Sequence, residues 1–258
     1  MKKNVLIVGY GIVGKNLAKE LAVLKPDIYD KYNPDDNSNR DIVYDVAFLC
    51  VDTPMNENCI CDVTEVFDAV IHTKADVFVI KSTVLPGTTN DLKDMSGKEI
   101  IFSPEYYGTT QHNNNFNFDF TVLGGSVDAC DKVAQLLQTV YDARHKFYIV
   151  DSTTAELAKY MENSYLATKV SFCVQFYQIC QEIGVNYNQL RELFIADPRV
   201  NPSHTFVYQD KPFWDSHCLN KDIYAVATKY NAEFLKNVMN FNSWCISNNY
   251  LTQHYENN

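Results

Sequence analysis

The chain begins with an apolar strand pattern that runs directly into a glycine-rich turn and then into a helical pattern. Val5-Leu6-Ile7-Val8 predicts a buried strand, and Gly9-Tyr10-Gly11-Ile12-Val13-Gly14 follows it without a break. Residues 15–21 then have helical spacing. This order of strand, turn and helix is typical of the first unit of a wound parallel sheet that binds a dinucleotide.

Each glycine of this turn has a physical reason. Gly9 allows the tight turn, Gly11 lets the backbone approach a pyrophosphate, and Gly14 permits close packing of helix on strand. Ile12 and Val13, within this turn, are further candidates for cofactor contact, because backbone N–H groups there can approach the pyrophosphate at the positive end of the helix.

A second strand, Asp27–Asp30, ends in a carboxylate at the spacing expected for a ribose ligand. Asp30 would accept hydrogen bonds from the ribose hydroxyls and repel a 2′-phosphate, which favours NAD over NADP. Lys31, the next residue and another candidate for cofactor contact, weakens that preference slightly. The alternative is a structural glycine turn followed by a solvated aspartate.

Length and charge exclude several classes of protein. A chain of 258 residues suits one large α/β domain, or a nucleotide domain with a smaller partner domain. The formal charge of -10 and the lack of basic runs argue against nucleic acid as a partner. Membrane association is equally unexpected, because no stretch is apolar and long enough to span a bilayer.

The eight cysteines do not form the pattern of a disulfide framework. Cys50, Cys173, Cys180 and Cys245 lie in apolar patterns, where thiols behave as small hydrophobes, so we expect a reducing cytoplasm. Cys59-Ile60-Cys61 has no second Cys/His pair at ligand spacing, and we expect no metal.

Strand and helix patterns alternate through residues 1–150, which predicts a Rossmann-type doubly wound parallel sheet and an NAD-binding domain over that range. The expected elements are strands at 45–51, 77–81, 100–102, 120–125 and 146–150, and helices at 63–73 and 129–140.

Three of these strands are followed by loops with polar residues: Val51-Asp52-Thr53-Pro54, Ser82 to Thr89, and Ser103-Pro104-Glu105-Tyr106-Tyr107-Gly108. Ligands bind at the carboxyl ends of parallel strands, so Val51, Thr53, Ser82 and Thr83 are candidates for cofactor contact. Ordinary turn chemistry would also explain serine, threonine and proline at these places.

Residues 151–258 look mainly helical and predict a central, dimer-forming domain. Ser152-Thr153-Thr154 are cap candidates for a run from Ala155 to about Ile183, a helix of about 40 Å. Apolar residues on more than one face of that helix indicate a homodimer core: Leu157, Tyr160, Leu166, Val170, Phe172 and Phe176.

Two polar residues of the long helix could act together. Lys159 and Asn163 are four residues apart, so they share a face and could converge on one oxygen atom. An exposed, solvated helix face would give the same spacing.

A cysteine with polar neighbours lies near the end of the chain, in Cys218-Leu219-Asn220-Lys221-Asp222. We expect a helix to begin near Asn220, so that its dipole and Lys221 lower the thiol pKa and activate Cys218 as a nucleophile. The alternative is a buried structural thiol, which these polar neighbours disfavour.

Together these segments resemble the UDP-glucose/GDP-mannose dehydrogenase family over nearly the whole chain. The segments that carry the resemblance are Gly9–Gly14, Cys50–Pro54, Ser82–Thr89, Ser103–Tyr106, Ala155–Asn163 and Cys218–Asp222. The resemblance implies oxidation of a nucleotide-sugar C6 alcohol, with UDP-glucose as the expected substrate, in two hydride transfers to NAD⁺ through a cysteine thioester.

It also implies roles for individual residues. Cys218 corresponds to the nucleophile, Lys159 and Asn163 to the oxyanion stabilisers, Asp222 and Thr83 to the groups that position water, and Glu105 to a catalytic-loop glutamate. The implied substrate contacts are Glu105, Tyr106, Lys159, Asn163, Arg199, His204 and Lys221.

Three features depart from the family pattern. Phe213-Trp214-Asp215-Ser216 replaces a glycine-rich loop, and its aromatic rings could stack on a sugar or base. Thr109 replaces a second glutamate, and the chain ends after the central helices, which predicts that the C-terminal nucleotide-sugar domain is absent.

Two other functions stay open. A 3-hydroxyacid or 6-phosphogluconate-type dehydrogenase also places Lys-x-x-x-Asn on a long helix, but its single hydride transfer needs no thiol. A non-catalytic descendant that binds NAD and a sugar nucleotide fits the altered loop at 213–216 and the shorter chain.

Overall fold

The computed structural model describes residues 4–33, 35, 40–57, 60–106 and 118–255. Within this part, the chain forms two compact units, the first ending at Lys159 and the second running on from Tyr160. Helix α5 (Ser152–Ile183) contributes its first residues to unit 1 and the others to unit 2.

Unit 1 is built on a seven-stranded sheet with the order β2-β1-β3-β4-β5-β6-β7. The strands are β1 (Val5–Val8), β2 (Asp27–Tyr29), β3 (Val43–Leu49), β4 (Lys74–Ile80), β5 (Ile100–Phe102), β6 (Phe120–Gly124) and β7 (Lys146–Val150). The strand order reverses at β1, and the crevice at such a reversal is where doubly wound sheets bind nucleotides.

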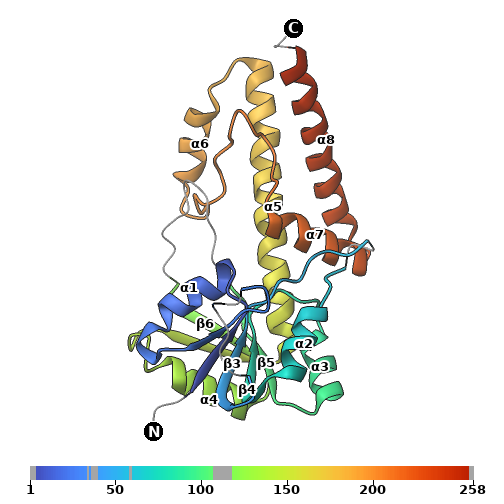
Figure 1. Ribbon diagram of the computed structural model, residues 1–258. Coiled ribbons are helices and arrows are strands. Elements are labelled where there is room, and N and C mark those ends of the chain that lie inside the picture. Colours follow the sequence, from blue (N-terminus) through green and yellow to red (C-terminus); the bar gives the residue numbers. More distant parts are fainter. Residues whose placement is uncertain (1–3, 34, 36–39, 58–59, 107–117, 256–258) are drawn as a thin grey trace. The chain divides into compact units, whose positions relative to one another are not determined.

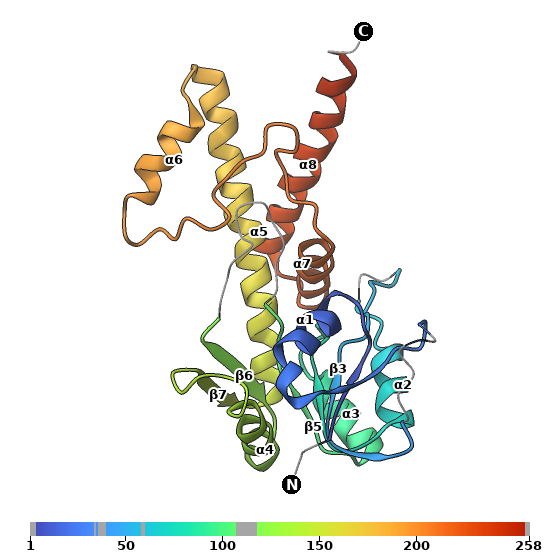
Figure 2. The same cartoon turned by 60° about the vertical axis from the view of Figure 1, so that its left-hand side comes forward.

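Helices lie on both faces of this sheet, α1 and α4 on one and α2 and α3 on the other (Figures 1 and 2). They are α1 (Ile12–Glu20), α2 (Thr64–His72), α3 (Thr88–Ser96) and α4 (Val127–Leu137), with a short 3-10 turn at Ala22–Leu24. The predicted doubly wound fold is therefore confirmed.

One strand pair differs from a fully parallel sheet. β5 and β6 run antiparallel and share a single paired position, Phe102 with Gly124. The sequence between them, which is not fully described, carries no helical crossover pattern, and a parallel neighbour needs a crossover. β3 and β4 also begin earlier than predicted, at Val43 and Lys74. In β3, Asp45 interrupts the apolar run after Val43 and Tyr44, and in β4 the first residues, Lys74 to Asp76, are polar or partly exposed.

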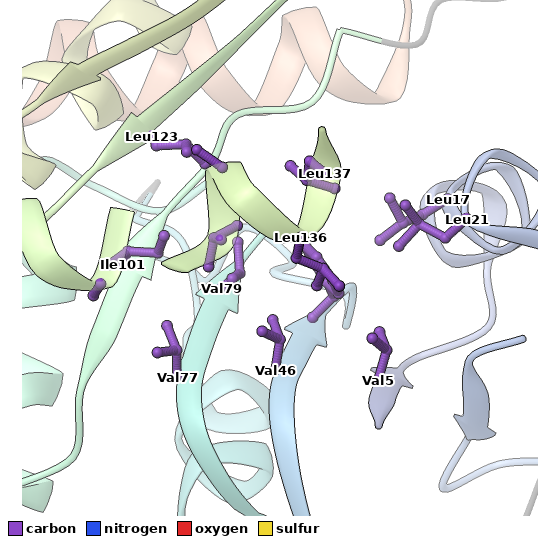
Figure 3. Packing of buried hydrophobic residues seen from close by; sticks show 14 of the residues in the cluster. Val5, Leu17, Leu21, Val46, Val77, Val79, Ile101, Leu123, Leu136 and Leu137 are labelled. Atoms are coloured by element: carbon purple, nitrogen blue, oxygen red, sulfur yellow. The ribbon is translucent and has the colours of Figure 1, made fainter. Parts of the chain in front are cut away.

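The alternation of side chains along each strand produces two cores. Val5 and Ile7 face the layer of α1 and α4, whereas Leu6 and Val8 face α2 and α3. Figure 3 shows the first of these cores, where Leu17 of α1, Leu21 directly after α1, and Leu136 and Leu137 of α4 lie over the strands.

Unit 2 is helical, as predicted, and holds the rest of α5, α6 (Tyr187–Ile195), α7 (His217–Lys229) and α8 (Glu233–Tyr255). Ala167 of α5, Ile223 of α7 and Val238 of α8 form its main core together with Trp214. The Trp214 indole donates to Ser171 Oγ at 2.8 Å and its backbone exchanges two hydrogen bonds with Asn242. The expectation that this ring stacks on a ligand is wrong, because Trp214 is buried in the helical core.

Two predicted helix starts are also corrected. Ser152-Thr153-Thr154 lie inside the first turn of α5, and the cap is Asp151, whose carboxylate accepts from Thr154 N at 2.9 Å. Helix α7 begins at His217 rather than near Asn220, and Ser216 caps it by accepting from Leu219 N. In both places an earlier oxygen-bearing side chain satisfies the first free N–H groups.

The cysteines predicted to act as small hydrophobes are all buried, and the seven cysteines that the structure describes are thiols. Burial raises the pKa of the Cys50 thiol to about 12. Cys59 lies outside the described residues. No helix within the described ranges combines the length and the apolar character that crossing a bilayer requires.

Candidate active site

The glycine turn after β1 has the geometry of a phosphate cradle. Gly9 has a φ of +91°, and a Cβ there would lie 2.7 Å from the carbonyl oxygen of Cys50. A Cβ on Gly14 would lie 2.0 Å from the Gly9 carbonyl oxygen, whereas one on Gly11 would meet nothing within 4 Å. Packing thus requires glycine at positions 9 and 14. Gly11 is the N-cap of α1, has no side chain to cap the helix, and leaves open space beside its first N–H groups. The turn fits a pyrophosphate.

Asp30 lies directly after β2 with its carboxylate fixed by the backbone. Oδ2 accepts from Tyr10 N at 2.7 Å and Oδ1 accepts from Tyr32 N at 2.8 Å. A carboxylate oxygen has more than one lone pair, so both can still accept from ribose hydroxyls. Lys31 is exposed, and its ammonium is 3.0 Å from Glu65 Oε1 of α2. Ile12 is exposed at the start of α1, and Val13 packs against the core beneath.

The loops after β3 and β4 are tied together by two hydroxyls. Thr53 Oγ1 donates to the carbonyl of Thr83 at 2.8 Å, and Ser82 Oγ donates to the carbonyl of Val51 at 2.5 Å. Both hydroxyl-bearing residues are buried. Four of the candidate cofactor residues therefore form one continuous edge of unit 1.

Glu105 forms an ion pair with Lys81 that no local sequence pattern predicts. Its Oε2 lies 3.3 Å from the ammonium of Lys81, and its Oε1 accepts from Tyr106 N at 2.7 Å. Lys81 is buried, and its ammonium also donates to Ser103 Oγ and to the carbonyl of Pro104. The sequence offered only an indirect indication of this ion pair. Lys81 directly follows four apolar residues of β4 that are buried, and a buried cation needs partners.

Lys159 lies on the first half of α5 with its ammonium over an aromatic ring. The Nζ atom is 4.8 Å from the centre of the Tyr106 ring, and Lys159 is only 9% exposed. Tyr106 in turn packs against Phe118 and Phe120, with ring centres 5.5 and 5.4 Å apart. Lys159 is therefore not on a solvated helix face. Tyr107, Gly108 and Thr109 lie outside the described residues.

A second unanticipated residue, Glu156, lies one turn before Lys159. Its carboxylate accepts from Gly87 N at 2.6 Å, Thr89 N at 2.8 Å and Thr89 Oγ1 at 2.6 Å, at the N-terminus of α3. Glu156 is fully buried, and desolvation raises its pKa against the lowering effect of these donors. The sequence carried only a weak signal, an acidic residue among apolar neighbours of α5.

In unit 2, Asn163 and Asp222 are in direct contact. The Asn163 amide donates to Asp222 Oδ2 at 2.5 Å, and Asp222 Oδ1 lies 3.2 Å from the ammonium of Lys221. All three side chains are buried, whereas Cys218, one turn before Asp222 on α7, is exposed. The structure thus excludes the buried structural thiol as an explanation of Cys218.

Arg199 and His204 lie in the connection between α6 and α7. The Arg199 guanidinium pairs with Asp197 at 2.6 Å and is exposed. His204 has a φ of +60°, and its Nδ1 is 2.7 Å from Ser203 Oγ. Burial and, secondarily, the charge of Lys169 lower the His204 pKa. Both residues make local turn contacts, and their role toward a substrate stays a prediction.

The fold and the glycine turn define the class: a dinucleotide-binding protein with a wound nucleotide unit and a helical unit. Profiles of the UDP-glucose/GDP-mannose dehydrogenase family match it twice, the NAD binding domain over residues 34–145 and the central domain over 153–244. The chain belongs to this family, and the prediction of NAD as cofactor is confirmed.

Named relatives agree with this family. The chain is 29% identical to a UDP-N-acetyl-D-mannosamine dehydrogenase of Methanocaldococcus jannaschii, over 77% of this chain and 48% of the relative. It is 31% identical to a UDP-glucose 6-dehydrogenase of Rickettsia prowazekii, over 82% of this chain and 52% of the relative. The chain thus spans about half the length of the curated relatives it matches.

The fold has a counterpart among solved structures. The structure of a UDP-glucose dehydrogenase from Pyrobaculum islandicum superposes with a TM-score of 0.79, at 21% identity, over 95% of this chain and 68% of that one.

Proposed function

We propose that this chain is an NAD-dependent nucleotide-sugar dehydrogenase that oxidises the C6 alcohol of a UDP-sugar, UDP-glucose first, to the carboxylate. The observation that carries the proposal is the exposed thiol of Cys218 on the first turn of α7, one turn from the buried contact of Asp222 with Asn163. A single oxidation needs no such thiol, whereas two successive oxidations at one carbon must hold the aldehyde between them.

Cys218 supplies the nucleophile. The N-terminus of α7 is the positive end of a helix dipole and favours the thiolate. The thiolate adds to the aldehyde carbon to form a thiohemiacetal, the second oxidation gives a thioester, and water releases the carboxylate and the thiol. The glycine turn and Asp30 would hold NAD⁺, which would supply the hydride acceptor for each oxidation.

The other residues stabilise charge and handle water. Lys159 and Asn163 would stabilise the oxygen that becomes negative, where donors in a buried site are most effective. Thr83 and Asp222 would position the attacking water. Glu105 and Tyr106 would contact the sugar, and Lys221, Arg199 and His204 other parts of the substrate.

The test is the number of NADH formed per sugar nucleotide. We expect two NADH per UDP-glucose from the wild type, with UDP-N-acetylmannosamine and GDP-mannose as the competing substrates. Cys218→Ser should bind NAD⁺ and stop short of the carboxylate. Lys159→Ala should slow the first oxidation about a hundredfold or more. The control Cys245→Ser alters a buried thiol that accepts a hydrogen bond from Gln178, and it should keep both NADH.

Other results would identify the alternatives. One NADH per substrate would replace the proposal with a hydroxyacid-type dehydrogenase. No NADH with any sugar nucleotide, despite NAD⁺ binding, would indicate the non-catalytic descendant. A Cys218→Ser variant with wild-type rate and stoichiometry would make the thioester route wrong.

We also propose that the chain forms a homodimer whose interface is built by α5. We further propose that the protein works in the cytoplasm. Within unit 2 the helix carries an exposed apolar stripe at Met161, Tyr165, Phe172, Phe176, Ile179 and Ile183. The three- and four-residue spacing places these side chains on one face. Tyr160, which we expected in this interface, is fully buried, and Val170 packs into the core of α5, α7 and α8.

A further inference from the structure

Two cations lie at the end of β2, where Asp30, the expected ribose ligand, follows Tyr29. Lys31 follows Asp30 directly, and the guanidinium of Arg40 stacks on the ring of Tyr29, the last residue of β2, at 3.9 Å. A basic side chain beside the ribose acid is what dinucleotide-binding folds use to bind the 2′-phosphate of NADP. On sequence alone, Lys31 and Arg40 weaken the discrimination that Asp30 provides.

Both cations are held by carboxylates of helix α2. The Lys31 ammonium donates to both oxygens of Glu65, at 3.0 and 3.2 Å, and the Tyr32 hydroxyl donates to the same carboxylate at 3.0 Å. The Arg40 guanidinium lies 3.9 Å from Asp68, one turn further along α2. The Glu65 hydrogen bond raises the pKa of Lys31.

The Glu65 contact is the stronger of the two. It is bidentate and shares the Tyr32 hydroxyl, whereas Asp68 is divided between Arg40 and His72 Nδ1 at 3.0 Å. Glu65 also lies in the first turn of α2, where the helix dipole favours a negative side chain. The carboxylate is thus held at this position independently of Lys31.

We propose that Glu65 is a specificity-determining residue for the cofactor, which excludes NADP by keeping Lys31 paired beside the ribose subsite. A 2′-phosphate would have to displace Glu65 from Lys31 and would meet three carboxylates there, Asp30, Glu65 and Asp68. NAD⁺, with a neutral 2′-hydroxyl, needs only Asp30. The proposal concerns the cofactor and does not depend on the sugar substrate.

Direct binding of NAD⁺ and NADP⁺ to the full chain, measured by calorimetry, tests this role. Glu65→Gln keeps the size of the side chain and removes its charge. We expect the ratio of NADP⁺ to NAD⁺ affinity to rise about two- to fivefold, the range that exposed ion pairs span, with NAD⁺ affinity nearly unchanged. In a Lys31→Gln background the same substitution should raise the ratio less, because the freed cation is missing.

Asp94→Asn is the matched control, since it removes one exposed carboxylate of α3 and changes the net charge equally. A rise in Glu65→Gln that exceeds the control and depends on Lys31 supports the proposal. An unchanged ratio overturns it, and so does an equal rise in the control or in the Lys31→Gln background, because the effect would then be one of bulk charge.

Discussion

The side-chain amide of Asn163 on α5 donates to the carboxylate of Asp222 on α7 at 2.5 Å, and both side chains are at least 95% buried. The hydrogen bond joins two helices whose contributing residues are 59 positions apart in the sequence. A bond to a charged acceptor inside a protein contributes more than one between neutral groups.

Asn163→Ala should therefore lower the free energy of unfolding by about 1.5–3 kcal/mol, because a buried carboxylate loses a donor. Urea unfolding followed by circular dichroism measures this difference. Asn237→Ala removes an exposed amide on α8 and should cost much less. Equal losses in the two variants would show that the Asn163 contact does not stabilise the fold.

Alanine substitutions at Gly11 and Gly14 should separate the two requirements of the turn. Gly14→Ala forces a Cβ against the Gly9 carbonyl oxygen and should lower the melting temperature by several degrees. Gly11→Ala meets no atom within 4 Å, so the fold should keep most of its stability while NAD⁺ affinity falls about tenfold or more. Calorimetric titration of both variants with NAD⁺ checks this, and unchanged affinity in Gly11→Ala would contradict a pyrophosphate at that place.

Glu156→Gln should destabilise the chain at pH 7 by about 1–3 kcal/mol, because an amide offers one acceptor where Gly87 N, Thr89 N and Thr89 Oγ1 all donate. Urea unfolding of both proteins from pH 7 to pH 4 tests the origin of this effect.

Desolvation, opposed by Thr89 and Gly87 and reinforced by Asp91, raises the folded pKa of Glu156. The stability linked to a raised pKa is fully present below the unfolded value of about 4.3 and is lost as pH rises through the folded value. The difference between wild type and variant should therefore widen as pH falls toward 4. A difference that narrows would mean that the hydrogen-bond donors, not desolvation, dominate this carboxylate.

The stripe on α5 predicts a dimer at micromolar concentration by light scattering. Met161→Glu should convert it to a monomer, because a charge would be buried in the interface. Leu193→Glu on α6 has the same exposure, 75%, lies off the stripe and should stay dimeric. A monomeric wild type would show that α5 does not form the proposed interface.

The predictions that were confirmed rest on patterns between residues close together in the sequence. The β1 strand, the glycine turn and α1 are contiguous, and their apolar spacing and glycine chemistry depend on near neighbours alone. The antiparallel pairing of β5 with β6 was not predicted, because the residues of a strand do not determine which strand it pairs with. The starts of α5 and α7 were misplaced, because several consecutive residues could serve as the helix cap.

The candidate site was predictable only in part for a similar reason. Spacing placed Lys159 and Asn163 on one face, but it could not show that Glu105 pairs with Lys81 or that Glu156 caps α3. These contacts join residues 24 and 69 positions apart, and a single sequence holds no information on such pairs beyond the cost of a buried charge.

The Glu156 carboxylate caps α3 and so links the loop after β4 to the start of α5 by hydrogen bonds. The two segments are therefore expected to move together. A shift of the loop that holds Thr83 would therefore also move the turn of α5 that carries Lys159. In descendants of this chain we expect positions 89 and 156 to change together, because they are the donor and the acceptor of one contact. Paired substitutions at these two positions would then show the coupling even where neither original residue is kept.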